Sequence, residues 1–333
     1  MMIPGITHSG RAAVAALVLF LSVFLSSCIY NISLTEPKGP LKEFTVGGEG
    51  KDKILFLDIS GIITDKTEKR FAFSEGERLV SRVREELDKA AKDADVKALI
   101  VRIDSIGGDV TTTDVLYNEI TVFRKKKNVP VVALLSSIAA SGGYYIALAA
   151  DSIVAHPTTV TGSIGVIAYR VNASGLMQKV GLTDETVKSG ELKDMGSPLR
   201  PSTEKERKVI QGIVDGLFTR FKTLVSERRG LKDDRLKAVI DGRVFTADEA
   251  VGNGLVDTVG YADDAVADAK SRAGLKDASI IVYSRPGSFR PNVYSATAAA
   301  PLSLDISMFN TSVFGLDEAG SGFKFLYMWS PGE

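Results

Sequence analysis

The middle of the chain alternates apolar runs with amphipathic stretches. Helical spacing of apolar residues is found at about residues 75–92, at about residues 113–126 and from Ser141 onward. The apolar runs between these stretches are "KILFLDISG", "KALIVRID", "VPVVALLSS" and "SIVAHP". Short apolar runs separated by helices are typical of β-α-β units, so the pattern predicts an α/β fold in which helices pack on a largely parallel sheet.

A longer amphipathic pattern covers residues 203–229 and predicts a long helix. Its apolar residues recur at helical spacing and are expected to face the core: Val209, Ile213, Leu217, Phe221 and Leu224. Further on, Thr246 is expected to cap a short helix, and Gly254 to lie in the turn that follows it.

Both ends of the chain differ in composition from the middle. Residues 28–52 are rich in glycine, proline and charge and are interpreted as a linker, which leaves residues 53–284 as the folded domain. Residues 285–333 are interpreted as an irregular extension. It ends in the apolar run "FKFLYMW", which we expect to dock on the body or on a neighbouring subunit.

The first 27 residues have the pattern of a secretory signal. Arg11 precedes an apolar segment over residues 12–25 that is short for a membrane span, and "LSSC" follows it. This box resembles a bacterial lipobox, so Cys28 is expected to carry a lipid that tethers a soluble domain to a membrane outside the cytoplasm. Ile29 in place of aspartate gives no signal for inner-membrane retention. An uncleaved N-terminal anchor helix is the alternative.

Composition narrows the classes of function. Lysine plus arginine equals aspartate plus glutamate at 41 each, so no net charge indicates a nucleic-acid partner. Cys28 is the only cysteine, which excludes an intrachain disulfide, and the two histidines are too few for a histidine-ligated zinc centre. No phosphate-binding glycine motif follows a strand. No metal or cofactor is therefore expected.

Ser141, in "AASGGYY", is the candidate nucleophile. It lies at the predicted start of a helix, where its own N–H is expected to be free. His8 lies in the signal segment and His156 is better explained as a strand-end residue, so a desolvated lysine is the base that remains. Lys188 in "TVKSGELKDMGSP" is suitable, and the glycines in "RIDSIGGDV" offer backbone N–H groups for an oxyanion.

Five motifs in order, with "TGSIGVI" and "DGRVFTADEAVGNGLVDTVG" beside the three above, resemble the signal peptide peptidase A family of Ser/Lys proteases. The similarity covers roughly residues 53–284. It implies a Clp-protease/crotonase-like spiral of β-β-α units.

The resemblance implies a role for each matching residue. Ser141 corresponds to the nucleophile, Lys188 to the general base, and Ser163 to the serine that orients the lysine. Gly107 and Gly108 correspond to the loop that supplies an oxyanion donor together with the N–H of Ser141. Lys193 is the competitor for the base, and isoleucine at position 106 replaces the family's usual proline.

The resemblance also implies the substrate class. It predicts a serine endopeptidase that cleaves apolar peptides such as remnant signal peptides and works as a homo-oligomer. A catalytically inert scaffold or binding protein on the same fold is the alternative. A crotonase-like acyl-CoA enzyme is the third class, and secretion disfavours it because CoA is cytoplasmic.

Overall fold

The computed structural model describes residues 39–66, 69–71, 74–75, 77–285, 292 and 324–329. The predicted signal segment, Cys28 and most of the expected linker and C-terminal extension lie outside the described residues. Among the residues described, none of the helices combines the length and apolar character needed to cross a bilayer.

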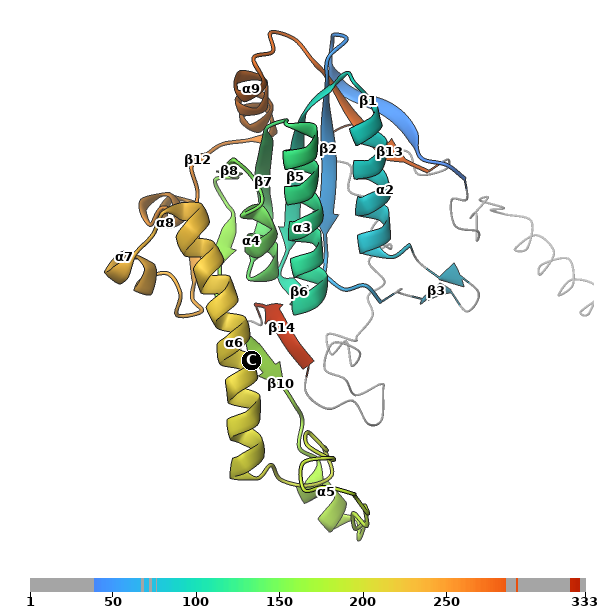
Figure 1. Cartoon of the computed structure of the whole chain (residues 1–333), viewed down its shortest axis with the longest axis vertical. Coiled ribbons are helices and arrows are strands. Elements are labelled where there is room, and N and C mark those ends of the chain that lie inside the picture. Colours follow the sequence, from blue (N-terminus) through green and yellow to red (C-terminus); the bar gives the residue numbers. More distant parts are fainter. Residues whose placement is uncertain are drawn as a thin grey trace, which may run out of the picture.

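A largely parallel sheet forms the centre of the molecule (Figure 1), and the expected α/β architecture is confirmed. Its order is β1-β13-β2-β5-β7-β8-β12, and β9 pairs with both β7 and β11. Only the β1–β13 and β9–β11 pairs of this sheet are antiparallel. The strands are β1 Lys42–Gly48, β2 Lys53–Ser60, β5 Val96–Ser105, β7 Val131–Ala140, β8 Ser152–Ala155, β9 Val160–Gly162, β11 Val244–Thr246, β12 Thr258–Val259 and β13 Ser279–Ser284.

Helices cover both faces of this sheet (Figure 1). Alternate residues of β2 point to opposite faces: Leu55 and Leu57 join the core under α2, α3 and α4, whereas Ile54 and Phe56 join the core under α9. Both faces are therefore apolar, as the continuous runs in the sequence predicted. The helices are α2 Leu79–Lys92, α3 Val110–Lys127, α4 Gly142–Ala147, α7 Asp233–Lys237, α8 Ala247–Gly252 and α9 Ala262–Ala273.

Strand β7 changes partners along its length. Residues 132–135 pair with β8, and residues 138–140 pair with β9. The change of partner brings the carboxyl ends of β7 and β9 side by side. Ser141 and Ser163, which follow these two strands, therefore lie at the same edge.

A second sheet of order β10-β14-β6 lies below the carboxyl end of the main sheet (Figure 1). It is formed by β6 (Gly107–Asp109), β10 (Ile167–Tyr169) and β14 (Lys324–Met328). The expected docking of the C-terminal apolar run on the body is confirmed, but residues 324–328 are a strand and not irregular structure. Residues Lys69–Phe71 and Ser74–Glu75 form a separate hairpin, β3–β4.

The long helix is present as α6 (Glu204–Arg229), preceded by the short α5 (Ser174–Lys179). Its expected core stripe is only partly right: Phe221 is buried, but Val209 and Ile213 are exposed. The amino-terminal half of α6, with α5 and the segment between them, extends away from the sheet (Figure 1). We refer to residues 170–213 as the arm.

Part of the segment expected to be linker is a strand: residues 42–48 form β1 on the edge of the sheet. A single edge strand paired on one side needs no continuous apolar run, so the sequence pattern did not reveal it.

Thr246 caps α8 as expected: its hydroxyl accepts from Glu249 N–H while the Glu249 carboxylate accepts from Thr246 N–H.

Candidate active site

Ser141 occupies a strained turn between β7 and α4. Its backbone has φ 52° and ψ −112°, a combination rarely adopted by residues other than glycine. The residue is 1% exposed, and its hydroxyl makes no capping hydrogen bond to α4. Ser141 is therefore not there as a helix cap. Such strain persists only where the surrounding structure enforces it, and it is concentrated at functional sites.

The backbone N–H of Ser141 is not free, contrary to expectation. It donates to the carbonyl of Gly162 at 2.7 Å and so extends the β7–β9 pairing. The next N–H groups, beginning with that of Gly142, belong to the first turn of α4 and have no intrahelical acceptor. The available donor beside the nucleophile candidate is therefore the Gly142 N–H.

The two glycines of β6 have different roles. Gly107 N–H donates to the hydroxyl of Ser105 at 3.0 Å, so that donor is occupied. Gly108 is paired with Tyr327 of β14, and Trp329 N–H donates to the Ile106 carbonyl two residues along the same pair of strands. Hydrogen-bonded residue pairs recur at every second position of an antiparallel pair of strands, so the Gly108 N–H also faces β14. Of the two expected oxyanion glycines, Gly108 is therefore the one whose N–H is directed away from its own loop, toward β14.

Close packing explains why glycine is needed here. A Cβ on Gly108 would lie 2.0 Å from the carbonyl oxygen of Ile63. Gly107 has φ 97°, and a Cβ on it would lie 1.9 Å from the Tyr327 carbonyl and 2.7 Å from the Gly142 nitrogen. The Tyr327 carbonyl, the β6 backbone and the start of α4 thus meet at one point. Ser105, which holds this loop, was not identified from the sequence.

Ser163 lies beside Ser141. It directly follows β9, has φ 51°, and donates its N–H to the Arg243 carbonyl at 2.7 Å. Two serines with positive φ at neighbouring strand ends are therefore held in place by backbone bonds. The structure brings the predicted nucleophile and the predicted orienting serine together.

Lys188 is not brought to this pair. It lies on the arm, where its ammonium contacts the Asp194 carboxylate at 2.7 Å and its side chain is 32% exposed. Arg200 binds the same carboxylate and also Glu206. Hydrogen bonds from Arg200 and Lys188 hold the pKa of Asp194 well below its usual range, and Arg200 lowers the pKa of Glu206 to about 2. Figure 1 shows the arm far from α4.

Tyr144 and Tyr145 are packing residues, as expected. Both are fully buried, and burial raises the pKa of each. Tyr144 donates to the Leu255 carbonyl at 2.8 Å, and Tyr145 donates to Asp114 at 2.5 Å. Neither phenol is available as a proton acceptor. The ring of Tyr145 instead forms one wall of the space that holds Tyr327.

Thr113 is a second polar residue that the sequence did not single out. Its hydroxyl is fully buried without a hydrogen-bond partner among the described residues. It would lie 2.8 Å from a Cβ on Gly142. The only signal in the sequence was its position one turn into the helix after "DSIGGDV", which did not distinguish it from Thr111 or Thr112.

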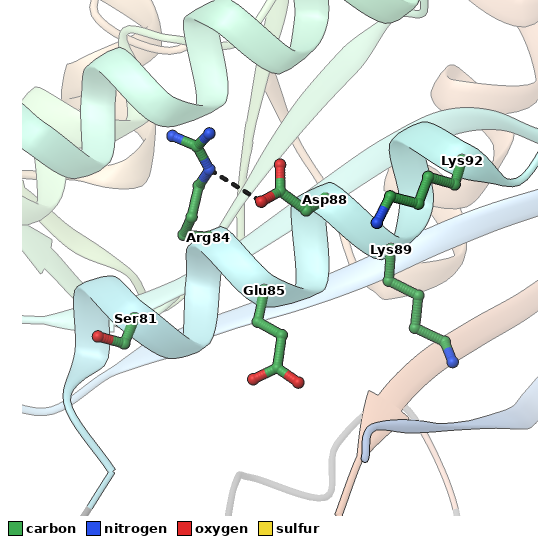
Figure 2. Close-up of a pocket in the computed structure, with 6 residues that line it drawn as sticks. All are labelled: Ser81, Arg84, Glu85, Asp88, Lys89 and Lys92. Carbon is green, nitrogen blue, oxygen red and sulfur yellow. Dashed lines mark hydrogen bonds and ion pairs between the residues drawn. The ribbon is translucent and has the colours of Figure 1, made fainter.

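His156 and the charged hollow along α2 lie apart from this site. His156 follows β8, contacts the Thr158 hydroxyl at 2.9 Å and packs its ring edge against Tyr261, as expected of a strand-end residue. A surface hollow of about 570 Å³ lies along α2, and Figure 2 shows the six side chains that line it. All its lining residues belong to α2 and most are charged, including the Arg84–Asp88 pair. None lies on an element next to Ser141.

A serine on a strained strand-to-helix turn, with the N–H groups of Gly142 and Gly108 nearby, is a suitable arrangement for a nucleophile, and the comparisons with known proteins place the chain among the serine peptidases. The chain belongs to peptidase family S49. Residues 123–276, which include Ser141, Ser163 and Lys188, match the profile described as "Peptidase family S49". The expected relationship to signal peptide peptidase A is confirmed.

Two relatives and one solved structure illustrate the similarity. A putative signal peptide peptidase SppA of Enterococcus faecium is 39% identical over 71% of this chain and 68% of its own length. The chloroplastic serine protease SPPA of Arabidopsis thaliana is 31% identical over 80% of this chain but only 39% of its own length. A mutant of ClpP1 from Listeria monocytogenes aligns over 63% of this chain and 94% of its own, with TM-score 0.41 and 18% identity.

Proposed function

We propose that Ser141 is the nucleophile of an endopeptidase that uses a lysine as its base. The Ser141 hydroxyl attacks the carbonyl carbon of an extended peptide, and its proton passes to the lysine amine. The N–H groups of Gly108 and Gly142 hold the negative oxygen of the tetrahedral intermediate. The lysine then protonates the leaving amine, and water hydrolyses the acyl-enzyme. The strained backbone of Ser141 is the observation that carries this proposal.

Lys188 is the proposed base, and it acts from a second copy of the chain. A base needs a neutral amine, whereas in the single chain Lys188 is paired with Asp194 on the arm, away from Ser141. Docking of the arm against another copy would exchange this ion pair for a desolvated position beside Ser163. The hydroxyl of Ser163 would then orient the amine.

The surface of the arm supports such an assembly. Large apolar side chains are exposed along it, and Val187, next to Lys188, is 98% exposed. Several large apolar side chains exposed on one segment are typical of an interaction site. The others on the arm are Leu176, Val180, Leu182, Leu199, Val209 and Ile213. A homo-oligomer would cover these residues and shield the lysines from water.

The proposed substrates are apolar peptides, in particular remnant signal peptides. The family relationship supports this. We propose that a lipid on Cys28 holds the enzyme at the outer side of a membrane, where such peptides remain after secretion. A single N-terminal transmembrane anchor is the alternative tether.

Turnover of an apolar fluorogenic peptide tests the assignment. Ser141→Ala should abolish cleavage, and Ser152→Ala, which also removes a buried hydroxyl, should leave most of it. Lys188→Ala should abolish cleavage, whereas Lys193→Ala should not. Full activity of Ser141→Ala would overturn the proposal, and the reverse result for the two lysines would reassign the base.

A further inference from the structure

Thr113 reaches the candidate active site from helix α3. Strand β6 carries Gly107 and Gly108, and α3 begins directly after it, so Thr113 lies in the first turn after the donor loop. Helix α4, which starts at Gly142, packs beside α3 (Figure 1). The position of a Cβ on Gly142 is 2.8 Å from the Thr113 hydroxyl oxygen. The hydroxyl therefore borders the residue that follows Ser141.

The Thr113 hydroxyl is buried and unpaired. Thr113 is 0% exposed, and within the described part of the chain its hydroxyl has no hydrogen-bond partner. A threonine inside a helix commonly donates to the carbonyl four residues earlier, and Thr113 does not. Two other buried threonines at this end of the sheet, Thr159 and Thr161, each donate to a carbonyl of β7, at 3.0 Å and 2.6 Å. A buried hydroxyl without a partner destabilises a fold, so its retention at Thr113 indicates a function.

The glycine at position 142 keeps this hydroxyl uncovered. A Cβ on Gly142 would lie 2.8 Å from the Thr113 hydroxyl oxygen and 3.1 Å from the Gly107 Cα. Any other residue at position 142 would therefore press against the hydroxyl and cover it. A hydroxyl turns about its C–O bond, so its hydrogen can be directed at an acceptor that enters beside Gly142.

We propose that the Thr113 hydroxyl is a third donor to the oxyanion, beside the N–H groups of Gly108 and Gly142. This inference rests on the proposed function and adds a catalytic residue to it. When the Ser141 oxygen bonds to the carbonyl carbon, the electron pair of the C=O double bond moves to the oxygen, which becomes negative and accepts the hydrogen bond. The hydroxyl keeps its own proton. Hydrogen bonds to a charged acceptor are stronger than those to a neutral one, so this contact favours the transition state over the bound substrate.

Replacement of Thr113 by valine removes the hydroxyl and keeps the shape of the side chain. Because the hydroxyl is unpaired in the folded chain, Thr113→Val should not lower the free energy of unfolding measured in urea. For an apolar fluorogenic peptide, kcat should fall at least about tenfold while KM changes less than about threefold. The matched control is Thr112→Val, which removes a buried hydroxyl from the neighbouring residue and should leave kcat unchanged.

A peptide boronic acid gives a second readout. Its boron bonds to the Ser141 oxygen, the serine proton passes to the base, and the adduct is a tetrahedral anion like the intermediate. Its inhibition constant should rise at least about tenfold in Thr113→Val and stay unchanged in Thr112→Val. Thr113→Ser keeps the hydroxyl and should retain most of kcat and most of the affinity.

Three results would overturn the third donor. They are an unchanged kcat in Thr113→Val, a fall in kcat that leaves the affinity for the boronic acid unchanged, and an equal fall in Thr112→Val. If Thr113→Val does not fold, Thr113→Ser and Thr113→Ala, which differ from each other only in the hydroxyl, are compared by the same criteria.

The wild-type chain separates this inference from the proposed function. A wild-type chain that cleaves no peptide and forms no boronic acid adduct at Ser141 would contradict the peptidase and the third donor together. Turnover that depends on Ser141, with kcat unchanged in Thr113→Val, would support the peptidase and contradict the third donor alone.

Discussion

Ser141 and Ser163 are joined through the backbone, because the N–H of Ser141 donates to the carbonyl of the residue just before Ser163. Each serine follows one of two paired parallel strands, and each has a positive φ. The β7–β9 pairing thus sets the distance between the proposed nucleophile and the serine proposed to orient its base.

Replacement of Ser141 should separate strain from chemistry. Ser141→Gly and Ser141→Ala both remove the hydroxyl and should both abolish cleavage. Only glycine relieves the positive φ, so Ser141→Gly should raise the free energy of unfolding by about 1 kcal/mol relative to Ser141→Ala. Urea denaturation of the two variants measures the difference. Equal stability would mean that the turn is not strained.

Gly108 should tolerate no side chain. Gly108→Ala places a methyl group 2.0 Å from the Ile63 carbonyl and must displace the N–H proposed to hold the oxyanion. We expect kcat to fall by about a hundredfold or more, the usual effect of losing such a donor. Gly252→Ala is the control, since nothing lies within 4 Å of its Cβ position. Normal kcat for Gly108→Ala would exclude the proposed donor.

Mixing of two inactive variants tests whether each site uses two copies. Chains with Ser141→Ala keep the lysine, and chains with Lys188→Ala keep the nucleophile. If the two groups come from different copies, unfolding and refolding the variants together should restore roughly a quarter of wild-type activity, as random pairing in a symmetric assembly predicts. Each variant refolded alone should stay inactive. An inactive mixture with normal oligomer size would place both groups in one chain.

The ion cluster of Asp194, Arg200 and Glu206 on the arm should make the stability of the arm sensitive to acid. Arg200 holds the pKa of Glu206 at about 2, below its ordinary value of 4.5. A lowered carboxyl pKa stabilises the folded state above the unfolded value and loses that effect as pH falls toward the folded value. Stability should therefore fall between about pH 4.5 and 2. Urea denaturation across that pH range measures the free energy of unfolding. Glu206→Gln should reduce its fall, and Glu204→Gln should not. A fall that Glu206→Gln leaves unchanged would have another source.

Activity should rise with pH if Lys188 is the base. A free lysine amine titrates near pH 10.4, so its protonated form dominates near neutrality. Only the neutral amine can accept the Ser141 proton, so kcat/KM should increase with pH and stay high in alkaline conditions. Ser163→Ala should lower the plateau. A rate that is flat or falls from pH 6 to 9 would contradict a lysine base.

Strands β2, β5, β7 and β8 of the main sheet could be predicted from the sequence because they are buried on both faces. Runs such as Ile54–Ile59 have no polar alternation and are bounded by helical patterns, so strand and helix order followed directly. The capping pair at Thr246 is also local in sequence and was predictable for that reason.

The second sheet could not be predicted. Strands β6 and β10 have three residues each, and β14 joins them from more than 150 residues away. Its pairing depends on tertiary contacts such as Tyr327 against Tyr145, which have no periodic signature. The exposure of Val209 and Ile213 was missed because an apolar stripe on a helix has the same spacing whether or not the rest of the chain covers it.

The most direct test of the account is the site of covalent labelling by a fluorophosphonate probe, read by mass spectrometry of the digested protein. The probe reacts with a serine only where a base activates the hydroxyl. The account predicts a single label on the peptide that contains Ser141, lost in Ser141→Ala and greatly reduced in Lys188→Ala. A label on Ser163 or another serine, or no label on an enzyme that cleaves peptides, would contradict it.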